Sequence, residues 1–111
     1  MPIATCFLKN KSIGPEELQQ LVNEWAAIIQ VDQKDICVNA LTGFQQAGQN
    51  YALMIHLYLP SLWSEKDIGK IQTSLLELFC HYLDLKIPDV FIMTSIIQSG
   101  HVVENGEIVR W

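Results

Sequence analysis

Pro2 is the residue of this chain with the clearest capacity for chemistry. Met1 precedes a small residue and is expected to be removed, which makes the nitrogen of Pro2 a free secondary amine. An α-amino group titrates near ~7.7 in water, and apolar surroundings lower that pKa because they disfavour the charged form. Such an amine can serve as a general base or as a nucleophile toward a carbonyl group. The alternative is that Pro2 only begins a strand, where a missing N–H costs little.

Proton transfer beside a carbonyl group also needs a donor that stabilises the developing enolate. The candidates in the sequence are a backbone N–H, the ammonium groups of Lys11 and Lys34, and the hydroxyls of Tyr58, Thr94 and Ser95. A lysine near Pro2 would also lower the pKa of the amine by like-charge repulsion. For both lysines a solvated charge in a loop is the alternative interpretation, and the choice of donor stays open.

Acidic residues outnumber basic residues in this chain of 111 residues. Twelve Asp and Glu stand against seven Lys and Arg, for a formal net charge of −5. Proteins that bind nucleic acid need a basic face, because their cations replace the counterions of the phosphates. The cations here are scattered between Lys9 and Arg110 without a run. We therefore expect no nucleic-acid partner.

Cysteine and histidine are too dispersed to form a recognisable site. Cys6, Cys37 and Cys80 are odd in number and lack CxxC spacing, which disfavours a disulfide framework and a structural zinc site. The three histidines are isolated from one another, so we expect no metal and no cofactor. No signal-like segment begins the chain, and the longest strongly apolar stretch, 51–59, is too short to span a bilayer. These observations predict a cytoplasmic domain without membrane contacts.

The first half of the chain has the pattern of a strand, a helix and a strand. Residues 3–8 are rich in strand formers, and Gly14-Pro15 begins a helix with carboxylates in its first turn. Residues 35–42 are expected to form the second strand, followed by a polar loop over 43–50. The expected buried stripe of the helix consists of Leu18, Leu21, Val22, Trp25, Ile28 and Ile29.

The second half repeats this order. Residues 51–59 form an apolar strand that Pro60 ends, and Ser64 begins a helix whose apolar stripe runs to Tyr82. Residues 90–97 are expected to form the fourth strand. Asn105-Gly106, placed between short apolar segments, is a strong signal of a β-hairpin.

The sequence therefore predicts a single α+β domain over residues 1–111 with the order β-α-β-β-α-β. Right-handed crossovers would place both helices on one face of a four-stranded mixed sheet, with a C-terminal hairpin in addition. Residues 51–59 are apolar on both faces of their strand, so the face without helices also needs a cover. We expect a second copy of the chain as this cover, which predicts a homo-oligomer. The same order also describes ferredoxin-like modules that bind small molecules.

With this architecture, the chain resembles the tautomerase superfamily over nearly its whole length. The likeness rests on Pro2-Ile3-Ala4, on the two βαβ halves and on the chain length. Segments similar to those of macrophage migration inhibitory factor and its relatives are Ala52-Leu53, Ile68-Gly69-Lys70 and Pro88-Asp89-Val90-Phe91-Ile92. The ending, with Val102-Val103-Glu104-Asn105-Gly106 after the fourth strand, looks most like a group of uncharacterised bacterial tautomerase-fold proteins.

The resemblance implies a homotrimer whose sheets line a central barrel and whose sites lie at subunit boundaries. It implies that Pro2 is the catalytic base of an enol–keto proton transfer, or a nucleophile or an acid as in related members. Leu59, Phe91 and Met93 align with pocket positions of the relatives and, with Lys11 and Lys34, are the candidate substrate-binding residues.

The chain departs from both groups of relatives at the polar positions of that pocket. The lysine of the migration-factor group is replaced only by the shifted Lys34, and its tyrosine and asparagine align with Phe91 and Met93. One arginine of the oxalocrotonate-type enzymes aligns with Cys37, and Lys11 replaces the other only with a one-residue shift. The resemblance thus implies a more apolar pocket with fewer cations that could bind a carboxylate.

These observations lead to three hypotheses. The first is an enol–keto isomerase of a small α-keto acid, with Pro2 as general base and no cofactor. The second is a trimeric protein of the same fold that mediates interactions without catalysis. The third is a ferredoxin-like module that binds a small molecule.

Overall fold

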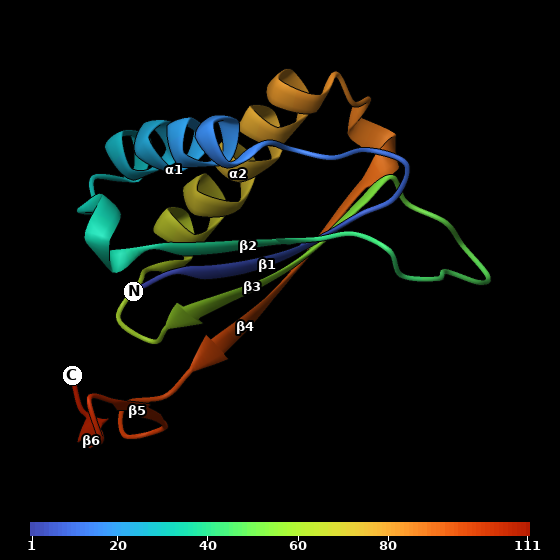
Figure 1. Ribbon diagram of the computed structural model, residues 1–111. Helices are drawn as coiled ribbons and strands as arrows, with labels where there is room; N and C mark the ends of the chain where they lie inside the picture. The colour runs from blue at the N-terminus through green and yellow to red at the C-terminus, as the bar shows by residue number, and fades with distance from the viewer.

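Strands β1 and β3 form the centre of a four-stranded sheet in the computed structural model, which describes residues 1–111 (Figure 1). The strands are β1 (Ile3–Leu8), β2 (Cys37–Leu41), β3 (Leu53–Pro60), β4 (Val90–Ile97), β5 (Val102–Glu104) and β6 (Glu107–Val109). The helices are α1 (Pro15–Ile29) and α2 (Glu65–Leu83), with short 3₁₀ helices η1 (Gln33–Asp35) and η2 (Ile87–Asp89). The expected α+β order is confirmed.

The strand order of the main sheet is β2-β1-β3-β4. β1 pairs in parallel with β2, β3 pairs in parallel with β4, and the two halves join through antiparallel pairing of β1 with β3. Each half is therefore a βαβ unit whose two strands are neighbours. A ferredoxin-like module is built from split βαβ units, in which another strand lies between the two. No strand lies between them here, so the ferredoxin-like alternative is wrong.

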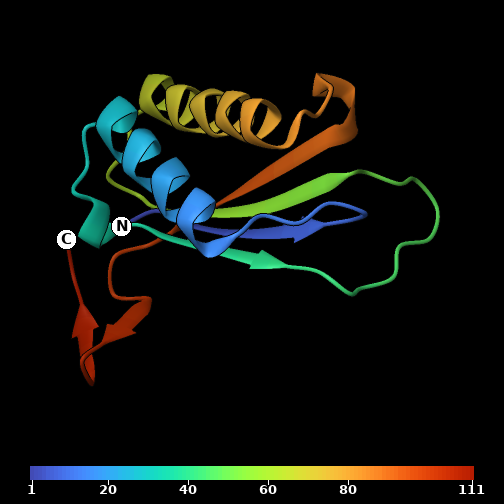
Figure 2. The same ribbon diagram turned by 45° about the horizontal axis from the view of Figure 1, so that its top comes forward.

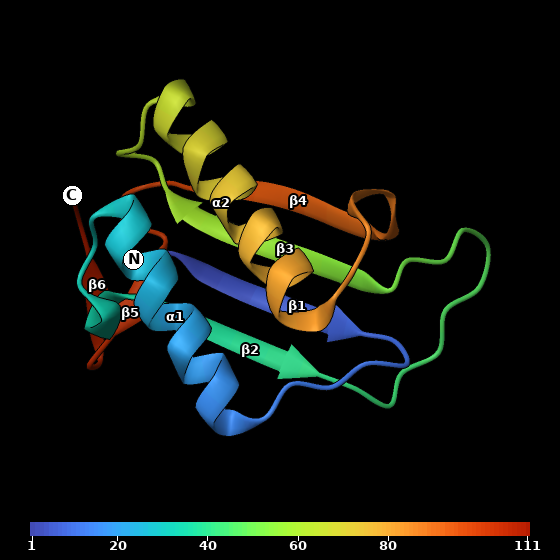
Figure 3. The ribbon, with the colours of Figure 1, turned by 90° about the horizontal axis from the view of Figure 1, so that it is seen from above.

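Both helices cover the same face of the main sheet (Figure 3). Pro15 occupies the first turn of α1, where no partner is needed for its missing N–H, and α1 ends at Gln30 in the left-handed conformation, with φ 59°. α2 begins after Ser64, whose side chain accepts a hydrogen bond of 3.1 Å from the N–H of Asp67. Ser64 therefore caps the helix, and the predicted start of this helix is confirmed. Neither helix is both long and apolar enough to cross a membrane.

The core lies between the helices and the sheet. Every second side chain of β1 and β3 is buried there, namely Ala4, Cys6, Leu8, Leu53, Ile55, Leu57 and Leu59. Trp25 of α1 is fully buried against α2, and its Nε1–H donates to the hydroxyl of Ser74 at 3.2 Å. The expectation for Ile28 is wrong, because this side chain is 39 % exposed. Ile28 lies about 100° around the helix from the buried Ile29, beyond the edge of the stripe.

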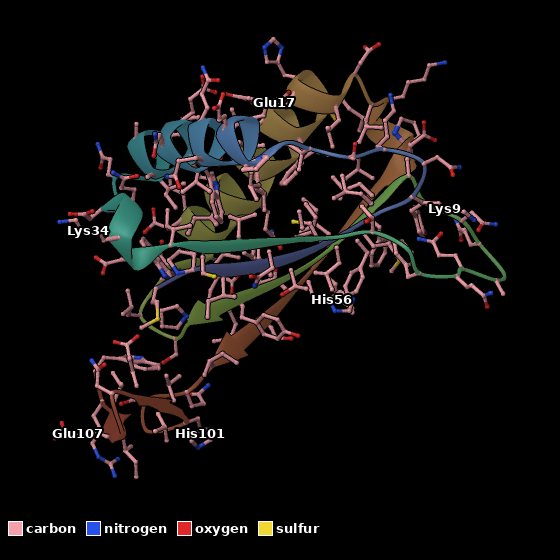
Figure 4. The ribbon with its side chains drawn as sticks, in the orientation of Figure 1. Lys9, Glu17, Lys34, His56, His101 and Glu107 are labelled. Atoms are coloured by element: carbon pink, nitrogen blue, oxygen red, sulfur yellow. The ribbon has the colours of Figure 1, made fainter.

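The opposite face of the sheet has no helix over it. Strand alternation places Phe7 of β1, Met54 and His56 of β3, and Phe91 and Met93 of β4 on this helix-free face. The rings of Phe7 and His56 lie 5.3 Å apart between centroids. Figure 4 shows His56 on the side of the sheet away from the helices. The predicted apolar face is therefore present. No helix covers it in the single chain, and the loop before β3 covers only one end of it, where the ring of Phe44 contacts that of Phe7 at 5.6 Å between centroids.

Both boundaries of β2 and both boundaries of β3 differ from the prediction: β2 spans 37–41 in place of 35–42, and β3 spans 53–60 in place of 51–59. β2 begins at Cys37 and not at residue 35, because the side chain of Asp32 accepts a hydrogen bond of 2.9 Å from the N–H of Lys34 and starts η1. β3 includes Pro60, which pairs with Ile97 of β4. The pairing of β3 with β1 ends at Tyr58, so Pro60 has no β1 partner that would need its N–H.

The C-terminal hairpin lies apart from the main sheet, at the end where the N-terminus is found (Figure 2). Asn105 and Gly106 form its turn with φ values of 53° and 76°. Positive φ at both positions is what a tight hairpin turn requires, and Asn-Gly tolerates it. The N–H of Gly100 donates to the carbonyl oxygen of Val109 at 3.0 Å, which closes the base of the hairpin. The predicted hairpin is confirmed.

Candidate active site

Pro2 is fully buried at the start of β1 and is linked to the half-exposed Met1. Its carbonyl oxygen accepts a hydrogen bond of 3.1 Å from the N–H of Cys37. This bond extends the pairing of β1 with β2 by one residue, so the backbone at Pro2 is held by the sheet. A reactive group placed there has a fixed direction, because its backbone cannot rotate freely.

An apolar cavity of about 60 Å³ lies at the chain segment that carries Pro2: its neighbours Met1 and Ile3 line the cavity, whereas Pro2 itself does not. This volume is several times the roughly 10–15 Å³ that one water needs. Four parts of the chain meet around it: the N-terminus, the end of β3, the end of β4 and the C-terminal hairpin. The lining residues are Met1, Ile3, Tyr58, Leu59, Pro60, Ile97, Val102 and Trp111. None of these side chains carries a formal charge, and the hydroxyl of Tyr58 is the only oxygen among them.

Trp111 is fixed as one wall of this cavity by two hydrogen bonds. Its backbone N–H donates to the hydroxyl of Ser99 at 2.8 Å, and its indole Nε1–H donates to the hydroxyl of Ser61 at 3.0 Å. Ser61 directly follows β3, so the second bond ties the hairpin to the main sheet. The indole N–H is thereby satisfied, and its ring presents apolar surface to the cavity.

The terminal amine beside this cavity has a perturbed pKa. Burial lowers the pKa of the Met1 α-amino group below its ordinary value, because the charged form loses hydration. The carboxylates of Asp35 and Glu104 act in the opposite direction and stabilise the charged form. The effect of burial is the larger one, so an amine at this end of the chain is more often neutral than one in water.

The structure brings two predicted site residues to the end of the sheet that carries Pro2. Leu59 lines the cavity. Lys34 lies on η1 at the same end (Figure 4), but it does not line the cavity. Among the candidate hydroxyls, Tyr58 lines the cavity, whereas Thr94 donates to the side-chain oxygen of Gln72 beneath α2.

The other predicted residues lie elsewhere in the single chain. Lys11 follows the far end of β1, about 20 Å from Pro2 for six strand residues. It borders an open, polar hollow of about 510 Å³ together with Lys9, Asn50 and Asp84. That hollow is larger than the cavity beside Pro2, but none of its lining residues lies near the N-terminus. We therefore place the candidate site at the smaller cavity.

Phe91 and Met93 lie on the helix-free face, at the far end and in the middle of β4. Phe91 pairs with Met54 and its ring contacts that of Tyr51 at 5.1 Å between centroids. Met93 pairs with His56 and is 53 % exposed. Neither residue reaches the cavity of its own chain.

Sequence reasoning missed Trp111 as a wall of the site and Asp35 and Glu104 as its charged neighbours. A signal for Trp111 was present, since a tryptophan stands two residues after the predicted hairpin and a hairpin reverses the chain. No local pattern connects Asp35 with the N-terminus, because the contact depends on the crossover through α1. No group of three or more His, Cys, Asp or Glu side chains is placed to hold a metal ion.

Of the comparisons with known proteins, only the one with solved structures finds similar proteins. No protein-family model matches the sequence. No curated protein matches it either. Among solved structures, the chain is similar to macrophage migration inhibitory factor from Trichinella spiralis, with TM-score 0.77 and 16 % identity over 94 % of this chain and 96 % of that one. It is also similar to a fused 4-OT solved as an asymmetric trimer. The TM-score is 0.77 at 13 % identity, over 96 % of this chain and 94 % of that one.

A third similar structure is that of Pt0534 inactivated by 2-oxo-3-pentynoate. Its TM-score is 0.76 at 14 % identity, over 96 % of this chain and 94 % of that one. Together with the strand order and the two βαβ halves, these likenesses establish the architecture. The chain has the fold of the tautomerase superfamily.

Proposed function

We propose that this chain, after removal of Met1, uses the amine of Pro2 as a general base for enol–keto proton transfer in a small carbonyl compound. The observation that carries this proposal is the burial of Pro2 between Met1 and Ile3, two residues that line an apolar cavity without charged side chains. Met1 lines that cavity, so its removal would both free the nitrogen and enlarge the space beside it.

The reaction follows from the groups at the cavity. The neutral amine accepts the proton of the enol hydroxyl, and the resulting ammonium delivers a proton to the neighbouring carbon, which forms the ketone. The hydroxyl of Tyr58 is the lining group that could donate to the developing oxyanion. The sequence predicts an α-keto acid as substrate, but proton transfer of this kind requires only the carbonyl group.

We also propose that the protein is a homotrimer. The helix-free face is largely apolar, and most of it has no cover in the single chain; the similar fused 4-OT is a trimer. In such an assembly a neighbouring subunit could place its Phe91 and Met93 near Pro2, which is the arrangement that the sequence resemblance implies. The mass of the particle in solution tests this part independently of any activity.

The substitution Pro2→Ala tests the catalytic part. Alanine is also small enough to follow a cleaved methionine, so the variant keeps an α-amine but loses the proline ring. We expect enol–keto isomerisation to fall by roughly 100-fold or more, which is the usual contribution of a general base. An equal melting temperature for the two proteins would show that the loss is chemical. An unchanged rate would reject Pro2 as the base.

A non-catalytic trimer of the same fold is the second candidate. It is favoured by one observation, namely that the cavity offers a single hydroxyl and no cation as an electrophilic partner. In that case the intact mass would show retained Met1, or the processed protein would react with electrophiles no faster than a model peptide.

A further inference from the structure

The helix-free face of the main sheet carries no formal charge at neutral pH. The pairing register of the four strands places the following residues on it: Ile3, Thr5, Phe7, Cys37, Asn39, Leu41, Met54, His56, Tyr58, Phe91, Met93 and Ser95. None of them is Asp, Glu, Lys or Arg. Such a face can be buried against another subunit without leaving an unpaired charge.

His56 is the basic side chain at the centre of this face. It lies on the central strand β3 and pairs with Thr5 of β1 and with Met93 of β4. The ring of Phe7 lies 5.3 Å from the imidazole between centroids. The loop over residues 42–50, which contacts Phe7 at one end of the face, contains no charged residue. No carboxylate of these elements is therefore placed to pair with a protonated imidazole.

Cys37 and Tyr58 are the other titratable side chains of the face. Both lie in the neighbouring row, since Ile3 pairs with each of them. A thiol and a phenol are uncharged in their protonated forms, so acidification adds no charge to either group. His56 is the one side chain of this face that gains a charge between neutral and mildly acidic pH.

The charged groups nearest to this face lie at its two ends. At the far end of β1, the ammonium group of Lys9 donates to Oδ1 of Asn50 at 2.9 Å. At the other end are the terminal amine and the two carboxylates that act on it, those of Asp35 and Glu104. The middle of the sheet, where His56 lies, separates these two groups of charges.

In the proposed homotrimer each subunit turns this face toward the other two. Three copies of His56 then enter one interface, and the strands of the neighbours bring no carboxylate with them. A protonated imidazole in this interface would lose hydration and be repelled by two like charges. In separated chains the imidazole is in contact with water, so it accepts a proton more readily. Uptake of protons therefore favours the separated chains.

We propose that His56 makes the assembly of this protein sensitive to pH. The homotrimer is stable at neutral pH and separates into folded single chains on mild acidification. This inference rests on the proposed homotrimer and is independent of the chemistry of Pro2. Any site at a subunit boundary exists only in the assembled particle, so acidification would also take such a site apart.

The mass of the particle over a dilution series at pH 7.5 and pH 5.5 tests the inference. These values lie one unit on either side of the ~6.5 at which histidine titrates in water. If the trimer binds no proton on His56, its dissociation constant rises by roughly 10-fold for each of three histidines, or about 1,000-fold. The concentration at which half of the chains are assembled scales as the square root of that constant and should rise about 30-fold. Circular dichroism at both pH values checks that the chains stay folded.

Two variants assign the response to a residue. His56→Gln keeps a polar side chain that does not titrate, and it should assemble equally well at both pH values. The double variant His81→Gln/His101→Gln removes the two histidines outside the face and should keep the full response. Both variants retain the terminal amine and every carboxylate, so a response from those groups would appear in both. If His56→Gln does not assemble at all, His56→Met, which resembles the neighbouring Met93, takes its place.

The outcomes separate this inference from the homotrimer on which it rests. Single chains at both pH values and at every concentration would reject the homotrimer and the inference together. A trimer that does not respond to pH, or that responds equally in His56→Gln, would reject the inference and leave the homotrimer intact. Tighter assembly in acid would also overturn it, because a carboxylate of a neighbouring subunit would then pair with His56.

Discussion

The backbone N–H of Cys37 donates a hydrogen bond of 3.1 Å to the carbonyl oxygen of Pro2. The register pairs Cys37 with Ile3, so the edge strand β2 holds the residue that precedes β1. In the proposed mechanism this bond holds the backbone that carries the amine in place. The link is accessible to mutation, because Cys37 is the first residue of an edge strand, where proline is tolerated.

The substitution Cys37→Pro removes that N–H. We expect a loss of stability of about 1 kcal/mol, which is typical of one hydrogen bond. We also expect labelling of Pro2 by a small electrophile to slow toward the rate of the model peptide. Urea unfolding and mass spectrometry measure the two effects. Cys37→Ala keeps the N–H and is the control; equal labelling rates in the two variants would show that the bond does not position Pro2.

The substitution Trp111→Ala removes one wall of the cavity. Water would then reach the amine, so its pKa should rise toward the ordinary value, and the carboxylates of Asp35 and Glu104 would favour this rise. An NMR titration of the amine measures the shift. Ser61→Ala is the matched control, because it removes the indole hydrogen bond and keeps the ring. A pKa that is unaffected by loss of the ring would mean that Trp111 does not exclude water.

The substitution Met93→Glu tests the helix-free face as a subunit interface. The side chain is 53 % exposed in the single chain, so a charge there should leave the fold of one subunit intact. In a trimer joined through this face, three buried charges would dissociate the particle, and light scattering would give the mass of one chain. Ile87→Glu, at a position 66 % exposed on η2, should change neither mass nor stability. A trimer that survives Met93→Glu would place the interface elsewhere.

Cys6 gives a prediction for the dependence of stability on pH. Burial raises the pKa of this thiol from 9.0 to about 12, so between these values the unfolded chain has lost a proton that the folded chain retains. Stability should therefore fall with rising pH above about pH 9, by roughly 1.4 kcal/mol per unit, and be unaffected below it. Cys6→Ala should lower stability below about pH 9 and should lack this part of the slope. Urea unfolding at pH 8 and pH 10 gives the free energy of unfolding of both proteins. If it changes by the same amount in both, the raised pKa is contradicted.

Most of the fold was predictable because its signals are local. β4 runs over the predicted residues 90–97, and the hairpin turns at Asn105-Gly106 as expected. The errors arise where a contact with residues outside the strand determines where that strand begins or ends. β2 begins late because Asp32 caps η1, and Pro60 remains in β3 because β4 extends to Ile97 beside it.

The site was less predictable than the fold. Pro2 is recognisable by its type and position, and Leu59 by resemblance. The cavity itself joins Met1, Tyr58 and Trp111, which lie up to 110 positions apart in the sequence. Such a meeting is set by the register of β1 with β3 and by the path of the hairpin, and no residue pattern specifies either one in advance.

The most direct test of this account is a titration of the Pro2 nitrogen. In protein from which Met1 has been removed, and with proline labelled with ¹⁵N, the chemical shift of Pro2 as a function of pH gives the pKa of its amine. The account predicts a pKa below that of a peptide that begins with Pro2-Ile3-Ala4, because burial beside the cavity disfavours the charged form. A pKa equal to or above the peptide value would contradict it.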